Sequence, residues 1–277
     1  MKSVSIQGIR GSFHHEAVNR FFHDQKMEII DSPTFKTVVM DVINGKANYG
    51  MMAIENSIAG AILPNYSLIT KYGLHIIGEV VLPIKHHLLA LPGETLDSIN
   101  EVRTHPMALL QCENFLEKYP SWKLLSKDDT ATCAYHIHIK KMKGVATIGS
   151  KLAAQMYQLH ILAENIHDVS DNYTRFYLLS ATPEKIENFT KASLYFTTDH
   201  TMGSLAKVLN ILAKYKMNIT KIQSVPLTGS IFQYSFHADI ITPGGDDTNY
   251  RMALNEIKNS TGFLHILGEY KEDKIKK

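Results

Sequence analysis

The sequence is poor in cysteine, in unbalanced charge and in long apolar runs, and each shortage excludes a class of protein. Two of the 277 residues are cysteines. This is too few for a disulfide framework, so we expect Cys112 and Cys133 to be reduced in a cytosol. The net charge of +2 argues against a nucleic acid or an anionic membrane as a partner. No apolar run reaches membrane-spanning length, and the N-terminus lacks the pattern of an export signal. These absences predict a cytoplasmic protein.

What is present is the composition of an ordinary globular protein, 44% hydrophobic and 20% charged, with a length that suits two or three domains. Up to residue 185, strands alternate with helices, which predicts an α/β fold of parallel sheets covered on both faces. We expect two lobes here, roughly residues 1–80 with 168–185 and residues 81–167, and a cleft between them. Residues 190–277 then follow the order strand, helix, strand, strand, helix, strand, a ferredoxin-like α+β unit.

Polar and glycine-containing junctions follow the strands of the first 185 residues. They are Gly11-Ser12, Asn56-Ser57, Asp129-Thr130, Gly149-Ser150 and Asn172–Arg175. In open α/β folds ligands bind at this edge of a sheet, where helix starts converge. Gly8 and Gly11 do not make a dinucleotide fingerprint, because the third glycine is missing. The pattern predicts a cleft for a small, multiply charged anion.

The 14 histidines do not form a convincing metal site. His136 and His138 have a spacing seen in some zinc sites, but a helix turns such residues apart. The other histidine pairs lack a cysteine or carboxylate at ligand spacing. We therefore expect no metal and no other cofactor.

The segment Asp171–Phe176 places an amide, a phenol, a hydroxyl, a guanidinium and an aromatic ring directly before a predicted strand. Arg175 offers a planar fork of donors suited to a carboxylate, and Thr174 beside it offers a hydroxyl. On local grounds alone, a loop in which Arg175 pairs with Asp168 or Asp171 explains the segment equally well.

Five motifs, taken in order, resemble the prephenate dehydratase family over essentially the whole chain. They are Gly8–Phe13, Ala53–Ser57 with Gly60, His105–Cys112, Asp129–Ala131 and Asn172–Phe176. The last, Asn-Tyr-Thr-Arg-Phe, is the most specific. The resemblance implies two lobes like those of periplasmic binding proteins, and the C-terminal unit resembles an ACT domain, through which such enzymes sense phenylalanine.

The resemblance implies the conversion of prephenate to phenylpyruvate, with loss of water and carbon dioxide, in phenylalanine biosynthesis. We expect Thr174 to hydrogen-bond the departing hydroxyl and act as or relay the general acid. Arg175 would hold a carboxylate, with Glu55 as the alternative proton source. The expected substrate-binding residues are Ser12, Asn56, Ser57, Gly60, Thr130, Ala131, Asn172 and Phe176. An arogenate dehydratase and a non-catalytic amino-acid sensor are the open alternatives.

The ACT resemblance implies phenylalanine binding at a subunit interface of a homodimer or homotetramer. The expected residues are Gly203, Ser204, Leu205, Ala206, Asn218, Gln223, Ser224 and Pro226. The chain departs from the family pattern in three places. His14 stands where serine is usual, Gly203–Ala206 replaces Gly-Ala-Leu-Val, and Gln223–Pro226 replaces Glu-Ser-Arg-Pro. We expect the missing arginine to weaken phenylalanine sensing or to change its relay.

Overall fold

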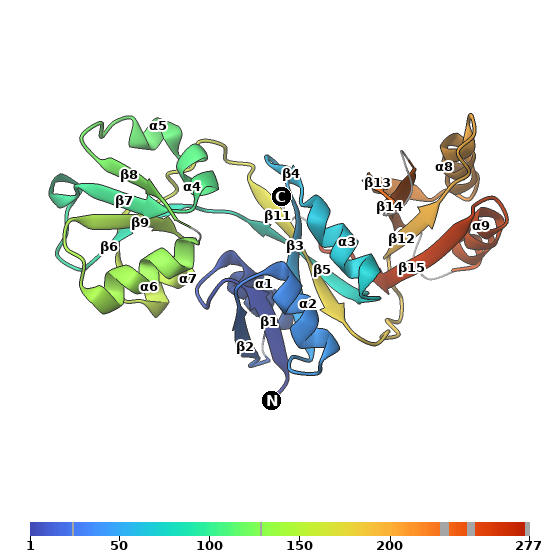
Figure 1. The fold of residues 1–277 in the computed structure, drawn as a ribbon, viewed down its shortest axis with the longest axis horizontal. Coiled ribbons are helices and arrows are strands. Elements are labelled where there is room, and N and C mark those ends of the chain that lie inside the picture. The colour runs from blue at the N-terminus through green and yellow to red at the C-terminus, as the bar shows by residue number, and fades with distance from the viewer. Residues whose placement is uncertain (24, 128, 228–232, 243–246, 275–277) are drawn as a thin grey trace.

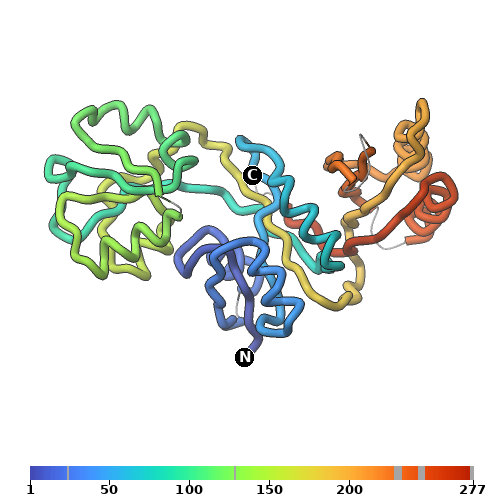
Figure 2. The backbone as a smooth tube through the Cα atoms, viewed as in Figure 1, coloured from blue at the N-terminus to red at the C-terminus, as the bar shows by residue number. Residues whose placement is uncertain are grey.

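The computed structural model describes residues 1–23, 25–127, 129–227, 233–242 and 247–274. Three sheets with their helices lie side by side (Figure 1), and we call them lobe 1, lobe 2 and the C-terminal unit. Lobe 1 is in the middle. The backbone passes from lobe 1 to lobe 2 and back again before it enters the C-terminal unit (Figure 2). In the described ranges, no helix is long and apolar enough to cross a lipid bilayer.

Lobe 1 is built on the strand order β2-β1-β3-β11-β5, with the short β4 beside β3. Its elements are β1 (Ser3–Gln7), α1 (Phe13–Phe22), β2 (Glu28–Ser32), α2 (Phe35–Ile43), β3 (Tyr49–Asn56), β4 (Gly60–Ala61), α3 (Leu63–Lys71), β5 (His75–Pro83) and β11 (Tyr173–Ser180). Strand β1 is parallel to β2 and β3, but β11 is antiparallel to β3 and β5. The predicted parallel sheet is therefore mixed, because β11 returns from lobe 2 and enters from the opposite end.

Lobe 2 has the strand order β10-β6-β9-β7-β8. Its elements are β6 (His87–Ala90), η1 (Leu96–Ser98), β7 (Glu101–Thr104), α4 (Pro106–Leu110), α5 (Glu113–Leu116), β8 (Lys123–Ser126), α6 (Thr130–Lys140), β9 (Val145–Gly149), α7 (Lys151–Met156) and β10 (His160–Ala163). The amphipathic pattern of Met107–Tyr119 predicts one helix, but the structure has two short ones. The helix breaks where the Gln111 carbonyl accepts from the backbone N–H of Asp168 at 2.8 Å.

The C-terminal unit is an antiparallel sheet of order β13-β14-β12-β15 with two helices, as the sequence predicts. Its elements are β12 (Lys191–Thr197), α8 (Ser204–Lys214), β13 (Asn218–Pro226), β14 (Tyr234–Ile241), α9 (Thr248–Lys258) and β15 (Phe263–Tyr270). The two helices pack on the apolar residues of one face of the sheet.

Strand β11 divides its side chains between two cores. Phe176 belongs to the core under α1, whereas Tyr177 belongs to a core shared with Leu267 of the C-terminal unit. This follows from the alternation of side chains along a strand. At the second core β15 lies against β5 so closely that a Cβ on Gly268 would be 1.9 Å from the carbonyl oxygen of Ile76. Glycine is required at this contact between lobe 1 and the C-terminal unit.

Candidate active site

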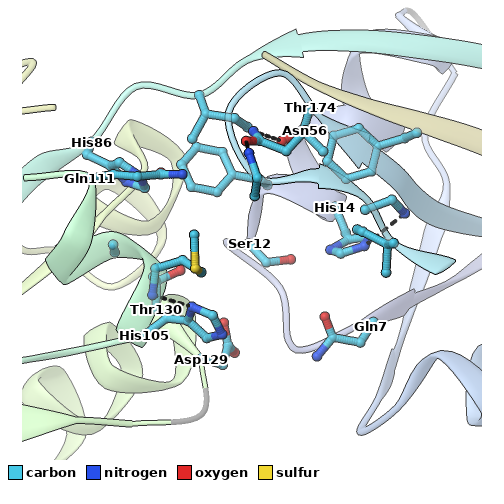
Figure 3. A pocket seen from close by; sticks show the side chains of 18 of the residues that line it. Gln7, Ser12, His14, Asn56, His86, His105, Gln111, Asp129, Thr130 and Thr174 are labelled. Atoms are coloured by element: carbon cyan, nitrogen blue, oxygen red, sulfur yellow. Dashed lines mark hydrogen bonds between the residues drawn. The ribbon is translucent and has the colours of Figure 1, made fainter. Parts of the chain in front are cut away.

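A cavity of about 390 Å³ opens between lobe 1 and lobe 2. Figure 3 shows polar side chains from both lobes converging on it. The polar lining residues are Gln7, Ser12, His14, Asn56, His86, His105, Gln111, Asp129, Thr130 and Thr174. The volume suits a small organic ligand.

The cavity lies at the strand edge that the sequence predicts. Gln7 and Asn56 end the strands β1 and β3. Thr174 lies at the start of β11, and because β11 is antiparallel, its start meets the ends of its neighbours. Helix α1 begins at the same edge, directly after the capping side chain of Ser12, and α6 of lobe 2 begins on the other side of the cavity, directly after Asp129.

The amide of Asn56 sets the direction of hydrogen bonding at Thr174. Its Oδ1 accepts from the backbone N–H groups of Ile58 and Ala59 at 3.0 and 2.9 Å, so Nδ2 is the donor. Nδ2 donates one hydrogen to Asn172 Oδ1 at 2.7 Å, and its other hydrogen is shared between Thr174 Oγ1 and the Tyr173 carbonyl, both at 3.0 Å. Because the Thr174 oxygen accepts here, its hydroxyl proton is available for a ligand.

Asn172 carries this hydrogen bonding across to lobe 2. Its Nδ2 donates to Gln111 Oε1 at 3.0 Å, and His86 Nε2 donates to the same oxygen at 2.9 Å. A chain of hydrogen bonds thus joins Thr174 to His86 and ties the two lobes together. Sequence reasoning missed Gln111 and His86, although Gln111 belongs to one of the five motifs.

Six of the residues predicted to touch the substrate line the cavity. They are Ser12, Asn56, Gly60, Thr130, Thr174 and Phe176. Ser57 instead ties the end of β3 to the start of β11. Its Oγ donates to the Asp171 carbonyl and accepts from the Tyr173 N–H, both at 2.9 Å. Ala131 is fully buried in α6 and Asn172 supports Asn56, so neither faces the cavity.

Arg175 and Glu55 lie on the opposite face of the sheet, contrary to the prediction that they contact the substrate. Alternation along β11 turns Arg175 away from the cavity that Thr174 and Phe176 line. The Arg175 side chain is 7% exposed, with Nε 2.7 Å from Glu55 Oε1 and Nη1 2.6 Å from Asp239 Oδ2. Protein carboxylates therefore pair with Nε and Nη1 of the guanidinium that was expected to hold the substrate.

These two residues belong to a charged cluster that joins lobe 1 to the C-terminal unit. Its members are Glu55, Glu79, Arg175, Lys191, Lys221 and Asp239. Lys191 Nζ lies 2.9 Å from both oxygens of Glu79, and Lys221 pairs with Glu55. Burial alone would raise the pKa of Asp239, but Arg175 and Lys191 hold it below its ordinary value. Three carboxylates thus face three cations, which compensates their burial.

Stability is expected to fall as the pH is lowered from 6.5 towards 4. Burial lowers the pKa of His14, His86 and His237 from 6.5 to about 4, so the unfolded chain binds protons in this range that the folded chain does not. Burial raises the pKa of Glu16 from 4.5 to about 7, which acts in the opposite sense and offsets one histidine. Together these four groups contribute roughly 2 to 3 kcal/mol of unfolding free energy per pH unit.

Urea unfolding at several pH values between 7.5 and 4.5 measures this slope. The variant Glu16→Gln is expected to steepen it by about one proton equivalent, or roughly 1.4 kcal/mol per pH unit. An unfolding free energy that stays level down to pH 5 would contradict the burial of the three imidazoles.

The two cysteines are free and buried. Burial raises the pKa of the Cys112 thiol to about 12 and that of Cys133 to about 11, so neither is a nucleophile at neutral pH. Within the described ranges, no group of three or more histidine, cysteine, aspartate or glutamate side chains is placed to hold a metal ion.

The residues predicted to bind phenylalanine are divided in the structure. Ser204 and Leu205 line a hollow of about 360 Å³ together with Phe236, and Gly203 and Ala206 line another of about 370 Å³. The remaining predicted residues line neither hollow, and they are Asn218, Gln223, Ser224 and Pro226, all on β13. Neither of these two hollows brings the residues at the start of α8 together with those of β13.

Comparison with known proteins gives consistent matches over the whole chain. Residues 4–184 match the family model described as prephenate dehydratase. The chain is 35% identical, over 99% of its length, to a bifunctional chorismate mutase/prephenate dehydratase of Buchnera aphidicola from Acyrthosiphon pisum, of which it covers 72%. It is 34% identical, over 98% of its length, to arogenate dehydratase 2 of Petunia hybrida, of which it also covers 72%.

Two solved structures resemble the chain over 98% of its length. One is GqqA, described as a quorum-quenching acylase, with a TM-score of 0.87 and 28% identity over 98% of that protein. The other is described as prephenate dehydratase of Arthrobacter aurescens in complex with L-Phe, with a TM-score of 0.84 and 26% identity over 90% of that protein.

Proposed function

This chain belongs to the prephenate dehydratase family, and we propose that it is a hydro-lyase that converts prephenate to phenylpyruvate in phenylalanine biosynthesis. The observation that carries the proposal is the orientation of Thr174. Because Asn56 donates to its oxygen, the hydroxyl is left as a donor in a cavity of suitable volume.

The chemistry asks little of the protein beyond orientation and one hydrogen bond. Prephenate carries two carboxylates and a hydroxyl on a non-aromatic ring. The bond to the ring carboxylate breaks, its electron pair enters the ring, and the hydroxyl leaves with a proton as water. Aromatisation drives these steps, so a weakly acidic donor is sufficient. Thr174 gives the hydrogen bond to the departing oxygen, and Asn56 keeps it aimed.

Neutral donors bind the substrate carboxylates in this proposal. Among the described residues that line the cavity there is no lysine or arginine. Helix α1 begins at the cavity, and the N–H groups of a helix start favour an anion. The hydroxyl of Thr130, at the first position of α6, adds a donor on the lobe 2 side.

Phenylpyruvate formation from prephenate at neutral pH tests the proposal directly. Neutral pH is required because acid alone drives this reaction. We expect turnover by the purified chain. A chain that is folded but turns over neither prephenate nor arogenate would leave the amino-acid sensor as the better account.

Arogenate is the second candidate substrate, favoured by the similarity to a protein named arogenate dehydratase. It differs from prephenate only in carrying an amino group in place of the side-chain carbonyl, so the same Thr174 chemistry applies. The ratio of kcat/KM for the two substrates decides between them. We propose prephenate as the preferred one, and a higher kcat/KM for arogenate would reverse this.

We also propose that phenylalanine binds to the C-terminal unit and lowers turnover. The support is the solved relative described in complex with L-Phe and the hollow beside Ser204 and Leu205. Isothermal titration is expected to show binding, and Ser204→Phe, which fills the hollow, is expected to abolish it without lowering turnover in the absence of phenylalanine. Asn255→Phe, at an exposed position of α9, is the matched control and is expected to keep binding. Absence of binding to the unmodified chain would contradict the proposal.

A homodimer or homotetramer fits the division of the predicted phenylalanine residues. Residues of β13 on one chain and of the α8 start on another would form a single site between two copies. The two free, buried cysteines agree with a cytoplasmic location.

A further inference from the structure

His14 occupies the cavity wall at the position where the family motif usually has serine. It lies in the first turn of α1, and its side chain is almost fully buried. The imidazole is held between two aromatic rings, with centroid distances of 5.0 Å to Phe176 and 5.6 Å to Phe35. Phe176 meets it edge to face, at an interplanar angle of 82°. The orientation of the ring is therefore set by packing.

One hydrogen bond fixes the tautomer of this imidazole. The backbone N–H of Ala53 donates to His14 Nε2 at 3.3 Å. Nε2 therefore carries no proton, and in the neutral ring the proton is on Nδ1. Burial lowers the pKa of His14 to about 4, so the ring is neutral at physiological pH. The Nδ1–H group has no hydrogen-bond partner among the described residues, and the side chain lines the cavity (Figure 3).

The Nδ1–H donor of His14 is important because the described lining of the cavity has no cationic lysine or arginine. The one carboxylate among the described lining residues, Asp129, accepts from Ala131 N, Thr132 N and Thr132 Oγ1 at the start of α6. This carboxylate takes up N–H groups that would otherwise face an anion. With no lysine or arginine in the described lining, a bound carboxylate depends on neutral donors. Thr174 is already committed to the departing hydroxyl.

We propose that His14 Nδ1–H donates a hydrogen bond to the side-chain carboxylate of the substrate and so acts as a substrate-binding residue. The inference rests on the proposed function. The side-chain carboxylate is favoured over the ring carboxylate by the chemistry of the reaction. A donor on the ring carboxylate would stabilise the charge that must disperse when carbon dioxide leaves, and would slow the step. A donor on the side-chain carboxylate binds substrate and transition state equally.

The variant His14→Phe tests the inference, because it keeps a ring between Phe35 and Phe176 and removes both nitrogens. We expect KM for prephenate to rise roughly 10- to 100-fold, as for loss of a hydrogen bond to a charged group, with kcat within about threefold. The inhibition constant of phenylpyruvate, which keeps the side-chain carboxylate, is expected to rise in parallel. His14→Gln, whose amide offers an acceptor to Ala53 and a donor to the cavity, is expected to restore much of the affinity.

His87→Phe is the matched control. His87 is also buried, and its Nδ1 accepts from the backbone N–H of Asn165 at 3.2 Å, but it does not line the cavity. It is expected to lower the melting temperature about as much as His14→Phe and to leave KM unchanged.

Two results would overturn the inference while the unmodified chain still turns over prephenate. One is a His14→Phe variant with unchanged KM, which would make His14 a packing residue. The other is a raised KM with an unchanged phenylpyruvate inhibition constant, which would remove the contact with the side-chain carboxylate. Failure of the unmodified chain to turn over prephenate would instead contradict the proposed function itself.

Discussion

Replacing Thr174 by alanine is expected to lower kcat for prephenate about 10²- to 10³-fold, the usual cost of losing one donor aimed at developing charge. The hydroxyl oxygen accepts from Asn56 at 3.0 Å, so the proton that the substitution removes is the one available to the departing hydroxyl. KM is expected to change little, because the bond strengthens only as the carbon–oxygen bond breaks. Steady-state formation of phenylpyruvate at neutral pH measures both constants.

Thr174→Ser is the control for this prediction. It keeps the hydroxyl and the hydrogen bond from Asn56, so we expect kcat to stay within about tenfold of the unmodified chain. Near-normal turnover by Thr174→Ala would remove this threonine from the chemistry. Equal losses in the serine and alanine variants would instead assign its effect to packing.

Replacing Arg175 by methionine is expected to lower the free energy of unfolding by about 3–5 kcal/mol, the range for removing one partner from a buried ion pair. The guanidinium faces three carboxylates, at 2.7 Å for Glu55, 3.3 Å for Glu79 and 2.6 Å for Asp239. Methionine fills a similar volume but leaves these carboxylates with less positive charge. Urea unfolding at pH 7 measures the loss.

Arg20→Met is the matched control, because Arg20 also pairs across to the C-terminal chain segment, at 3.2 Å from Asp273, but is partly exposed. We expect this variant to lose no more than about 1 kcal/mol. Equal losses in the two variants would show that burial of the charged cluster does not determine its contribution. Turnover by the folded fraction of Arg175→Met would show that Arg175 does not hold the substrate.

The sequence predicts the architecture and the edge at which the cavity lies, because both depend on local patterns. The alternation of strands and helices indicates the two lobes, and capping residues such as Ser12 mark the helix starts at the cavity. The antiparallel entry of β11 is not predictable in this way. The return of residues 168–185 to lobe 1 is expected from the sequence, but the direction of β11 depends on its pairing with β3 and β5, which no local pattern records.

The side of the sheet that Arg175 faces is the clearest failure of sequence reasoning. A carboxylate-binding residue beside Thr174 is a reasonable expectation from chemistry alone, but the partners of Arg175 are Glu79 and Asp239, far away in the sequence. Gln111 was missed for the same reason, since its hydrogen bond with Asn172 forms only when the two lobes meet. His86 was missed with it, because it reaches this network through Gln111, which is 25 residues away in the sequence. Helix α3 was also missed, because the residues Leu63–Lys71 show little amphipathic pattern.

The side chains of the neighbours Thr174 and Arg175 lie on opposite sides of one sheet. The length of the segment before them therefore determines which side each of them faces. Deleting or inserting a single residue between Asn172 and Thr174 would exchange the two sides. The guanidinium would enter the cavity, and the hydroxyl would face the buried carboxylates. A relative that keeps the reaction is therefore expected to tolerate changes of residue type here more readily than any insertion or deletion.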